Sequence, residues 1–158
     1  MGEIETKKTE ADGIVKKYAL GALGMGIIPF PLIDMAALTG VQLKMIHRLS
    51  KLYHIEFSDH IGKSFIASLI GSEIPLSFSL NLIRFIKCAP ICGQLAGMIG
   101  FSLFGSASTY AVGRVFIQHF ESGGTFLTFN PQKAREGYKQ EFKKGKEEIM
   151  KSFVGIKP

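Results

Sequence analysis

The sequence predicts an all-α protein built of membrane-associated helical hairpins, with proline-broken helices and an amphipathic, basic C-terminal helix. Two observations predict this fold class. Apolar residues recur at three- and four-residue spacing, and the apolar/polar alternation of strands is nearly absent. In addition, three long tracts carry at most one charged residue each, which is more apolar length than a 158-residue bundle buries on all sides. The tracts are residues 18–43 with Asp34, residues 65–83 with Glu73, and residues 89–113 with no charge.

Composition limits the partners of the chain. The formal charge is +6 and the isoelectric point about 9.4, so anionic partners are favoured, either phospholipid headgroups or nucleic acid. Cys88 and Cys92 lack the spacing of a metal or redox pair, and no second Cys/His cluster accompanies them. We therefore expect reduced thiols, no metal and no cofactor.

The first helix is expected at residues 12–28, after a loosely ordered, charged arm at residues 1–12. It should end at a hinge, because Pro29 and Pro31 remove backbone donors. The apolar leg before this hinge has 11 residues, about 16 Å of helix, which is roughly half the hydrocarbon core of a bilayer. It cannot cross alone, so a re-entrant or shallow hairpin is expected. Asp34 should then cap the second helix at its positive end.

The second helix is expected at residues 35–54 and should have two faces. An apolar seam at three-four spacing consists of Met35, Leu38, Gln42, Met45, Leu49 and Leu52. The opposite, basic face consists of Lys44, His47, Arg48, Lys51 and His54. Two interpretations of the basic face stay open, a solvated surface and contact with anionic headgroups.

Ser58 or Asp59 should cap a third helix that runs to about Ile70, and a fourth is expected at residues 75–87. Glu73 stands beside a glycine and before a proline, much as Asp34 follows Pro29 and Pro31. This likeness is weak evidence for paired discontinuous helices, in which Asp34 and Glu73 would be acids beside an aqueous pore.

The fifth helical segment, residues 89–113, is the tract without charge. It would form a helix of about 37 Å, long enough to cross a bilayer core of roughly 30 Å. A helix-packing ridge of small residues follows its four-residue steps, interrupted only by Phe101: Gly93, Gly97, Gly105, Thr109 and Gly113. Gly100 and Ser102 would also permit a tight hairpin, so one spanning helix and two shorter helices both remain open.

The last helix should open at Asn130 and Pro131, a cap followed by proline at the first helical position. Its apolar stripe consists of Ala134, Tyr138, Phe142, Ile149 and Phe153. It can dock on the protein, on a partner or on a membrane. The residues predicted to contact headgroups are Lys44, Arg48, Lys51, Lys139, Lys143 and Lys146. We expect one helical domain at residues 13–153 and a short tail at residues 154–158.

Three stretches resemble the YcjF-like family of bacterial membrane proteins of undefined activity. They read GIIPFPLIDMAALTGVQLKMIHRLSKLYHIE, YAVGRVFIQHFESGGT and FNPQKAREGYKQEFKKGKEEI, within a resemblance that spans residues 13–149. Members of that family are often fused to, or encoded beside, small GTPases, so the resemblance implies a GTPase as partner. This chain lacks a phosphate-binding loop, and nucleotide hydrolysis by the chain itself is not expected.

The sequence therefore favours a non-enzymatic, membrane-embedded protein that acts as an oligomeric scaffold or adaptor with a GTPase or another cytosolic partner. No nucleophile elbow, paired catalytic carboxylates or metal spacing is present, and no nucleic-acid-binding module accompanies the basic residues. The resemblance implies the bacterial inner membrane, and the basic segments predict that both termini lie on its cytoplasmic side. Two alternatives remain, a pore or transporter with Asp34 and Glu73 at its aqueous path, and a soluble lipid-binding bundle. Partner identity, subunit number and biological process are not specified by the sequence.

Overall fold

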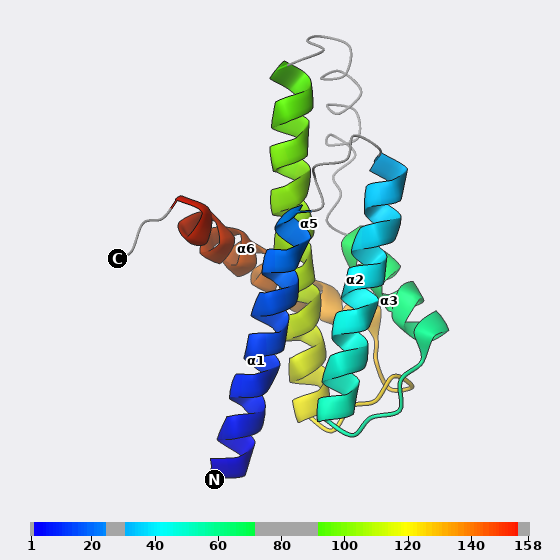
Figure 1. Cartoon of the computed structure of the whole chain (residues 1–158). Helices are drawn as coiled ribbons and strands as arrows, with labels where there is room; N and C mark the ends of the chain where they lie inside the picture. Colours follow the sequence, from blue (N-terminus) through cyan, green and yellow to red (C-terminus); the bar gives the residue numbers. More distant parts are fainter. Residues whose placement is uncertain (1, 25–30, 72–91, 155–158) are drawn as a thin grey trace.

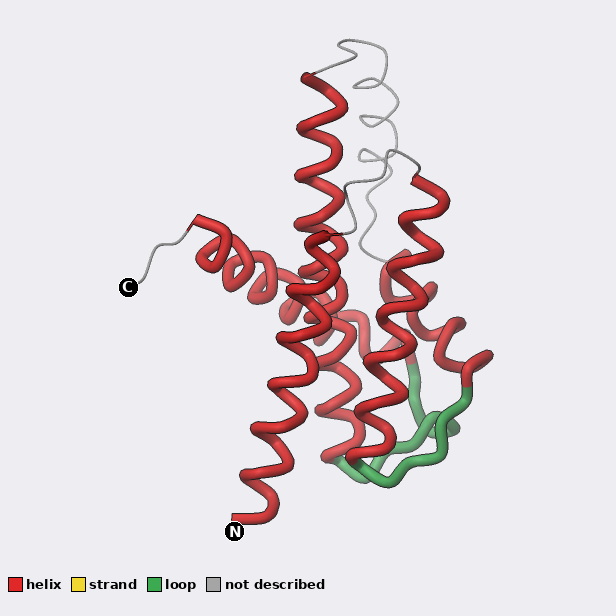
Figure 2. Tube along the Cα trace, in the orientation of Figure 1, coloured by secondary structure: helices red, strands yellow, loops and turns green. Residues whose placement is uncertain are grey.

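The computed structural model describes residues 2–24, 31–71 and 92–154. Within these ranges the chain is helical and has no strand, which confirms the all-α prediction for the described residues (Figure 2). The helices are α1 (Gly2–Ala22), α2 (Pro31–Leu52), α3 (Asp59–Gly71), α5 (Cys92–Glu121) and α6 (Pro131–Val154). Residues 75–87, where a fourth helix was predicted, and Glu73 lie outside the described residues.

Helix α5 is the centre of the fold and contacts each of the other four helices. Helix α1 runs upward from the N-terminus in Figure 1, α2 returns beside it, and α5 also runs downward. Helix α6 crosses α5 at a steep angle. The chain thus reverses direction between α1 and α2, so these two helices form the predicted hairpin.

Helix α1 begins earlier than the sequence predicted. Residues 2–12 were expected to be a loosely ordered arm, yet the helix is continuous from Gly2 to Ala22. The added segment has a tertiary contact of its own, because the Lys7 ammonium lies 5.7 Å from the centre of the Tyr53 ring. It also continues directly into residues docked on the core: Ala11 is fully buried, and Asp12 forms an ion pair with Arg114 of α5. A single apolar stripe on an otherwise charged helix was too weak a signal to predict this docking.

The break between the first two helices also differs from its prediction. Helix α1 ends at Ala22, with a short 3₁₀ turn at Leu23 and Gly24, rather than at Ile28. Helix α2 begins at Pro31, where proline has no donor to lose and its φ suits the first helical position. Asp34 is therefore inside the first turn, not ahead of the helix as predicted, and the surroundings of its side chain lie outside the described part. Pro29 lies outside the described residues.

The remainder of α2 agrees with its predicted seam. Leu38, Gln42, Met45 and Leu49 are buried, and Met35 and Leu52 are half-buried. Beyond the helix, the amides of His54 and Ile55 donate to the carbonyl oxygens of Lys51 and Ser50. His54 has a φ of 57°, so it occupies the left-handed position that glycine usually fills after a helix.

Helix α5 is one continuous helix of 30 residues, about 45 Å long. The alternative of a hairpin at Gly100 and Ser102 is therefore wrong within Cys92–Glu121. The helix ends in the same type of cap, here with Gly123 at a φ of 79°. Helix α6 starts as predicted, because the Asn130 side-chain oxygen accepts from the amides of Gln132 (3.0 Å) and Lys133 (3.1 Å).

The apolar core lies between α5 and the four helices around it. Its largest fully buried apolar side chains are Val15, Leu38, Met45, Ile46, Leu49, Ile66, Leu69, Val112, Phe116, Ile117 and Tyr138. Near the end of α5, Phe116 stacks on Phe129 with ring centres 4.7 Å apart. Phe57 and Phe126 meet edge to face at 5.6 Å, and this contact joins the two loops seen side by side in Figure 2.

Candidate functional site

Helices α1, α2 and α5 bring their uncharged segments to one end of the molecule. These segments are residues 18–24 of α1 and its following turn, residues 35–43 of α2 and residues 99–109 of α5, and they contain no Asp, Glu, Lys, Arg or His. We call them together the uncharged end. The three segments lie at the same end because α1 runs toward this end, whereas α2 and α5 begin there and run away from it (Figure 1).

Contacts between the helices fix the register of these segments. The Ser106 hydroxyl donates to the carbonyl oxygen of Ala19 at 2.6 Å, which aligns α5 with α1. A Cβ on Gly105 would lie 3.4 Å from Leu38, so the same part of α5 also faces α2. The uncharged segments are therefore neighbours in space and not only similar in sequence.

Apolar side chains remain accessible at the uncharged end. Leu20 is 49% exposed and Ile99 is 61% exposed. Ala36, Ala37 and Gly100 are exposed as well. A row of exposed apolar and small residues from three helices is typical of a surface that contacts a partner or a membrane.

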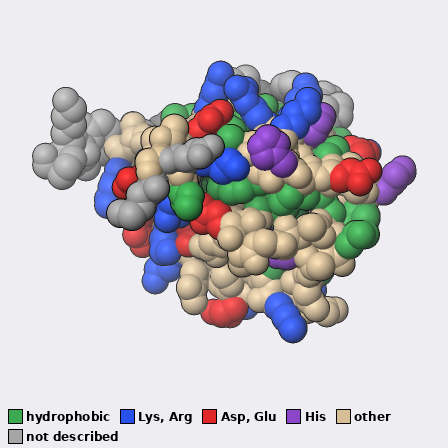
Figure 3. All heavy atoms as spheres, turned by 90° about the horizontal axis from the view of Figure 1, so that it is seen from below, with side chains coloured by type: hydrophobic (Ala, Val, Ile, Leu, Met, Phe, Trp, Pro, Cys, Tyr) green, Lys and Arg blue, Asp and Glu red, His purple; other side chains and the backbone are tan. Residues whose placement is uncertain are grey.

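The opposite end carries charges of both signs. Figure 3 views the molecule from this side and shows Lys, Arg, Asp, Glu and His side chains around the edge of the face. We call it the charged end. Here Tyr53 donates to a Glu121 carboxylate oxygen at 3.1 Å, and the Lys7 ammonium lies 5.7 Å from the centre of the Tyr53 ring. Burial and this carboxylate raise the pKa of Tyr53.

A group of buried polar side chains lies at the lower border of the uncharged end, within its α2 and α5 segments. The Gln42 amide nitrogen donates to the hydroxyl oxygens of Ser108 (3.2 Å) and Thr109 (3.3 Å). Ser108 also shares a hydrogen bond of 2.9 Å with the Tyr138 hydroxyl. These bonds tie α2 and α6 to α5, while Gln42 Oε1 has no hydrogen-bond partner among the described residues. They specify the packing of the helices, since no acid or base that could move a proton stands among them.

Below the buried polar group, Arg114 joins three helices. Its guanidinium pairs with Asp12 of α1, and its Nε lies 3.7 Å from Glu141 Oε2 of α6. The Lys144 ammonium contacts the other Glu141 oxygen at 2.8 Å. Because Glu141 is only 5% exposed, the two cations compensate a carboxylate that is otherwise costly to bury. The two positive and two negative groups balance, which is typical of a structural clamp.

A cavity of about 160 Å³ adjoins Arg114 and is lined by Asp12, Val15, Lys16, Tyr110 and Glu148 as well. Burial, and after it the Glu148 carboxylate, raises the pKa of Tyr110. The cavity is smaller than the roughly 300–1,000 Å³ of common ligand pockets. It is therefore a poor candidate for holding a lipid or a large substrate.

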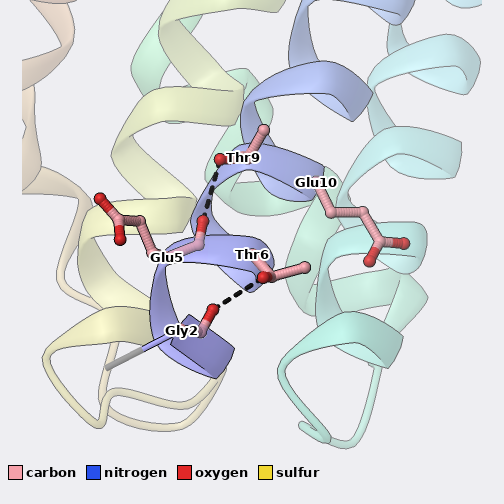
Figure 4. Close-up of a pocket in the computed structure, with 5 residues that line it drawn as sticks. All are labelled: Gly2, Glu5, Thr6, Thr9 and Glu10. Carbon is pink, nitrogen blue, oxygen red and sulfur yellow. Dashed lines mark hydrogen bonds between the residues drawn. The ribbon is translucent and has the colours of Figure 1, made fainter.

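A wider hollow lies on the first turns of α1 and is shown in Figure 4. It is lined by Gly2, Glu5, Thr6, Thr9 and Glu10, all of them exposed. The Thr6 and Thr9 hydroxyls are used within the helix, where they donate to the carbonyl oxygens of Gly2 and Glu5. The hollow is thus an open stretch of helix surface without convergent polar groups.

The histidines have structural neighbours. His119 Nε2 lies 2.9 Å from the Thr125 carbonyl oxygen, and His47 stacks on Phe57 with ring centres 4.5 Å apart. Within residues 2–24, 31–71 and 92–154, no group of three or more His, Cys, Asp or Glu side chains is placed to hold a metal.

The predicted packing ridge of α5 lies against its own chain. A Cβ on Gly113 would lie 2.5 Å from Val15 of α1 and 3.1 Å from the Met45 sulfur of α2. Thr109 donates to the Gly105 carbonyl oxygen and accepts from Gln42. Side-chain surroundings at Gly93 and Gly97 are outside the described part. Helices α1 and α2 of the same chain therefore pack against the described part of the ridge.

The residues predicted to contact headgroups lie on two helices. Lys44, Arg48 and Lys51 share the exposed face of α2, and Lys139, Lys143 and Lys146 are exposed on α6. Helix α6 itself docks on α5: Gly145 lies so close to Tyr110 that an added Cβ would be 2.8 Å from its ring. Its predicted stripe is buried at Tyr138 and Ile149.

Sequence reasoning missed Asp12 and Glu141 as partners of Arg114. The only local signal was that Arg114 ends an uncharged tract, and Asp12 is 102 residues away along the chain. Among the helices of the described ranges, none combines the length and the apolarity that a membrane crossing requires.

Comparison with known proteins identifies relatives. The sequence matches the family described as "Domain of unknown function (DUF697)" over residues 4–147. It is 39% identical over 137 residues to a protein called magnetosome membrane protein 22 from Magnetospirillum gryphiswaldense, an alignment that covers 86% of this chain and 70% of that protein. No solved structure matches it significantly.

Proposed function

Because the chain belongs to the DUF697 family, whose function is undefined, we propose a function from its geometry: a non-enzymatic, membrane-associated helical scaffold that is anchored by its uncharged end. The observation that carries this proposal is the convergence of uncharged segments from α1, α2 and α5. The magnetosome relative supports it, since the name of that protein places it in a membrane.

The proposed anchoring is shallow. The part of α5 that stands clear of the buried polar group, from Cys92 to Phe104, has 13 residues and a length of about 20 Å. The hydrocarbon core is roughly 30 Å thick, so this segment enters the bilayer without crossing it. The hairpin of α1 and α2 enters and returns beside it, and its exposed Leu20 contacts the acyl chains.

The charged end is then available to a partner in solution. The N-terminus lies at this end (Figure 1), which fits a cytoplasmic N-terminus at the bacterial inner membrane. The C-terminus is proposed to lie on the same side. A small GTPase is the partner class that the YcjF-like resemblance implies, and oligomerisation remains part of the scaffold proposal. A strictly monomeric particle in mild detergent would count against the oligomeric scaffold.

Flotation with lipid vesicles tests the anchoring. Leu20→Glu and Ile99→Glu place carboxylates at the uncharged end and should weaken vesicle binding by roughly 100-fold, since one charge in the apolar layer costs about 2.5–3.5 kcal/mol. Ile4→Glu on α1 and Leu127→Glu in the loop after α5 make the same chemical change at exposed positions of the charged end. These two controls should float like the wild type. Equal losses in all four variants, or no flotation of the wild type, would refute the proposal.

A pore or transporter is the second candidate. The observation in its favour is that Asp34, the only charge of the tract 18–43, lies in the first turn of α2 at the uncharged end. Conductance across planar bilayers that persists unchanged in Asp34→Asn and Glu73→Gln would remove the proposed role of these acids. The soluble lipid-binding alternative is less favoured, because the cavity beside Arg114 is too small for an acyl chain and a headgroup.

A further inference from the structure

Three basic residues lie at the border of the uncharged end, on two different helices. The register follows from Gly113 of α5, which faces both Val15 of α1 and Met45 of α2. Lys16 and Lys17 follow Val15 directly, on the side of the uncharged end. Lys44 precedes Met45 and so lies on the same side. Because Lys17 and Lys44 are far apart in the sequence, the sequence alone did not indicate that they lie at the same height along the helix bundle.

Arg48 extends this group by one helical turn, because it follows Lys44 on the same exposed face of α2. We call Lys16, Lys17, Lys44 and Arg48 the basic collar. All four side chains are exposed, and none forms an ion pair with another residue of the described part. The charges of Lys17, Lys44 and Arg48 are therefore available to an external anion, whereas Lys16 also lines the cavity that contains Asp12 and Glu148.

The collar stands where lipid phosphates would be. Beyond it, toward the uncharged end, the described residues of α1, α2 and α5 carry no charge other than that of Asp34. Lys and Arg can bury their aliphatic stems along apolar surface while the charged group stays in the headgroup layer. Basic residues this close to an anionic membrane surface each raise its affinity about fivefold.

We propose that the basic collar binds the phosphate groups of anionic phospholipids and gives the protein a preference for anionic membranes. This inference rests on the proposed anchoring and adds its lipid selectivity. It also separates the residues of α2 that were predicted to contact headgroups. Lys44 and Arg48 would contact lipid phosphates, whereas Lys51 would not reach them, because it lies about 10 Å farther from the apolar layer than Lys44 does.

The collar is tested with one double variant and one control double variant. Each removes one positive charge from α1 and one from α2. Lys17→Gln/Lys44→Gln removes one charge from α1 and one from α2 at the collar. Lys8→Gln/Lys51→Gln removes one exposed charge from each of these helices nearer the charged end. Lys8 is about 14 Å from the level of Lys17, beyond the roughly 10 Å over which salt screens charges.

Binding is measured to vesicles of phosphatidylcholine alone and to vesicles that contain phosphatidylglycerol in equal amount. The wild type should prefer the anionic vesicles. The collar variant should lose roughly 25-fold in affinity for them, and the control about two- to threefold. Both variants should bind pure phosphatidylcholine like the wild type, because the uncharged end is unchanged.

Each other outcome identifies what has failed. Equal wild-type affinity for both vesicles overturns the collar but leaves the anchoring proposal standing, whereas no binding to either overturns both. Equal losses of affinity for anionic vesicles in the two double variants would mean that the net charge of the protein, and not the collar, attracts the membrane. This outcome would also overturn the collar. The collar is overturned as well if the wild type binds a DNA duplex more tightly than anionic vesicles and the collar variant loses that binding.

Discussion

Substituting Gly113 by alanine tests the closest helix contact of the fold. The new methyl group would lie 2.5 and 2.9 Å from the two Cγ atoms of Val15 and 3.1 Å from the Met45 sulfur. Rotation about χ1 of Val15 does not relieve the contact, because a β-branched side chain exchanges one methyl group for the other. Helices α1 and α5 must separate by about 1 Å to reach the roughly 3.5–4.0 Å of ordinary carbon contacts.

The expected net effect is a destabilisation of up to about 2 kcal/mol. Overpacking of a well-packed core costs about 1–3 kcal/mol, and the higher helix propensity of alanine offsets about 1 kcal/mol of it. At this chain length, each kcal/mol lowers Tm by about 2–4 °C, so Tm should fall by up to about 8 °C. Thermal and urea unfolding followed by circular dichroism measure both quantities.

Two companion variants make the test specific. Val15→Ala removes both Cγ atoms, so the double variant with Gly113→Ala should cost about 1 kcal/mol less than the sum of the single changes. Gly13→Ala on α1 adds a methyl group with no atom within 4 Å and should stabilise by about 0.5–1 kcal/mol. Stabilisation by Gly113→Ala, or strict additivity with Val15→Ala, would refute the described contact. Dissociation of an oligomer by Gly113→Ala without loss of stability would assign the ridge to a subunit interface.

Three further outcomes are expected. His54→Gly should raise the free energy of unfolding by about 1 kcal/mol, because glycine has no steric penalty at a positive φ; a lower Tm in thermal unfolding would contradict the assigned cap. Arg114→Met leaves the buried Glu141 carboxylate with Lys144 alone and should cost about 3 kcal/mol in urea unfolding. The double variant with Glu141→Gln should recover part of this loss, and no recovery would argue against the clamp. The raised pKa of Tyr53 means that the unfolded state loses its phenol proton first, so stability should fall as pH rises above about 10 and Tyr53→Phe should flatten that fall; an unchanged slope would be inconsistent with the burial of this hydroxyl.

Helix positions followed from the sequence where a local signal was strong. The seam of α2, the cap at Asn130 and the start of α3 at Asp59 could all be predicted, because spacing and capping act within a few residues. The start of α1 could not, since Lys7 and Asp12 contact Tyr53 and Arg114, which are far away along the chain. The start of α2 was misplaced because proline was taken only as a breaker.

The candidate site also has features that the sequence predicted and features that it did not. The uncharged tracts were evident from the sequence, but their convergence depends on which helices run antiparallel. The clamp of Arg114 and the level shared by Lys17 and Lys44 come from contacts between helices. No spacing rule within a single helix contains that information.

The antiparallel arrangement of α1 and α2 has a consequence for how the protein would reach its membrane. The charged half of α1 comes before its uncharged segment, and the charged half of α2 comes after its own, so in the proposed anchoring both halves would lie on one side of the bilayer. In helix α5, as in α2, the charged residues come after the uncharged segment: Arg114 and Glu121 lie closer to the charged end. None of these described helices has to carry a charged end through the hydrocarbon. The folded bundle can therefore attach after synthesis is complete, by partitioning from solution, with no need for these helices to pass through a protein-conducting channel.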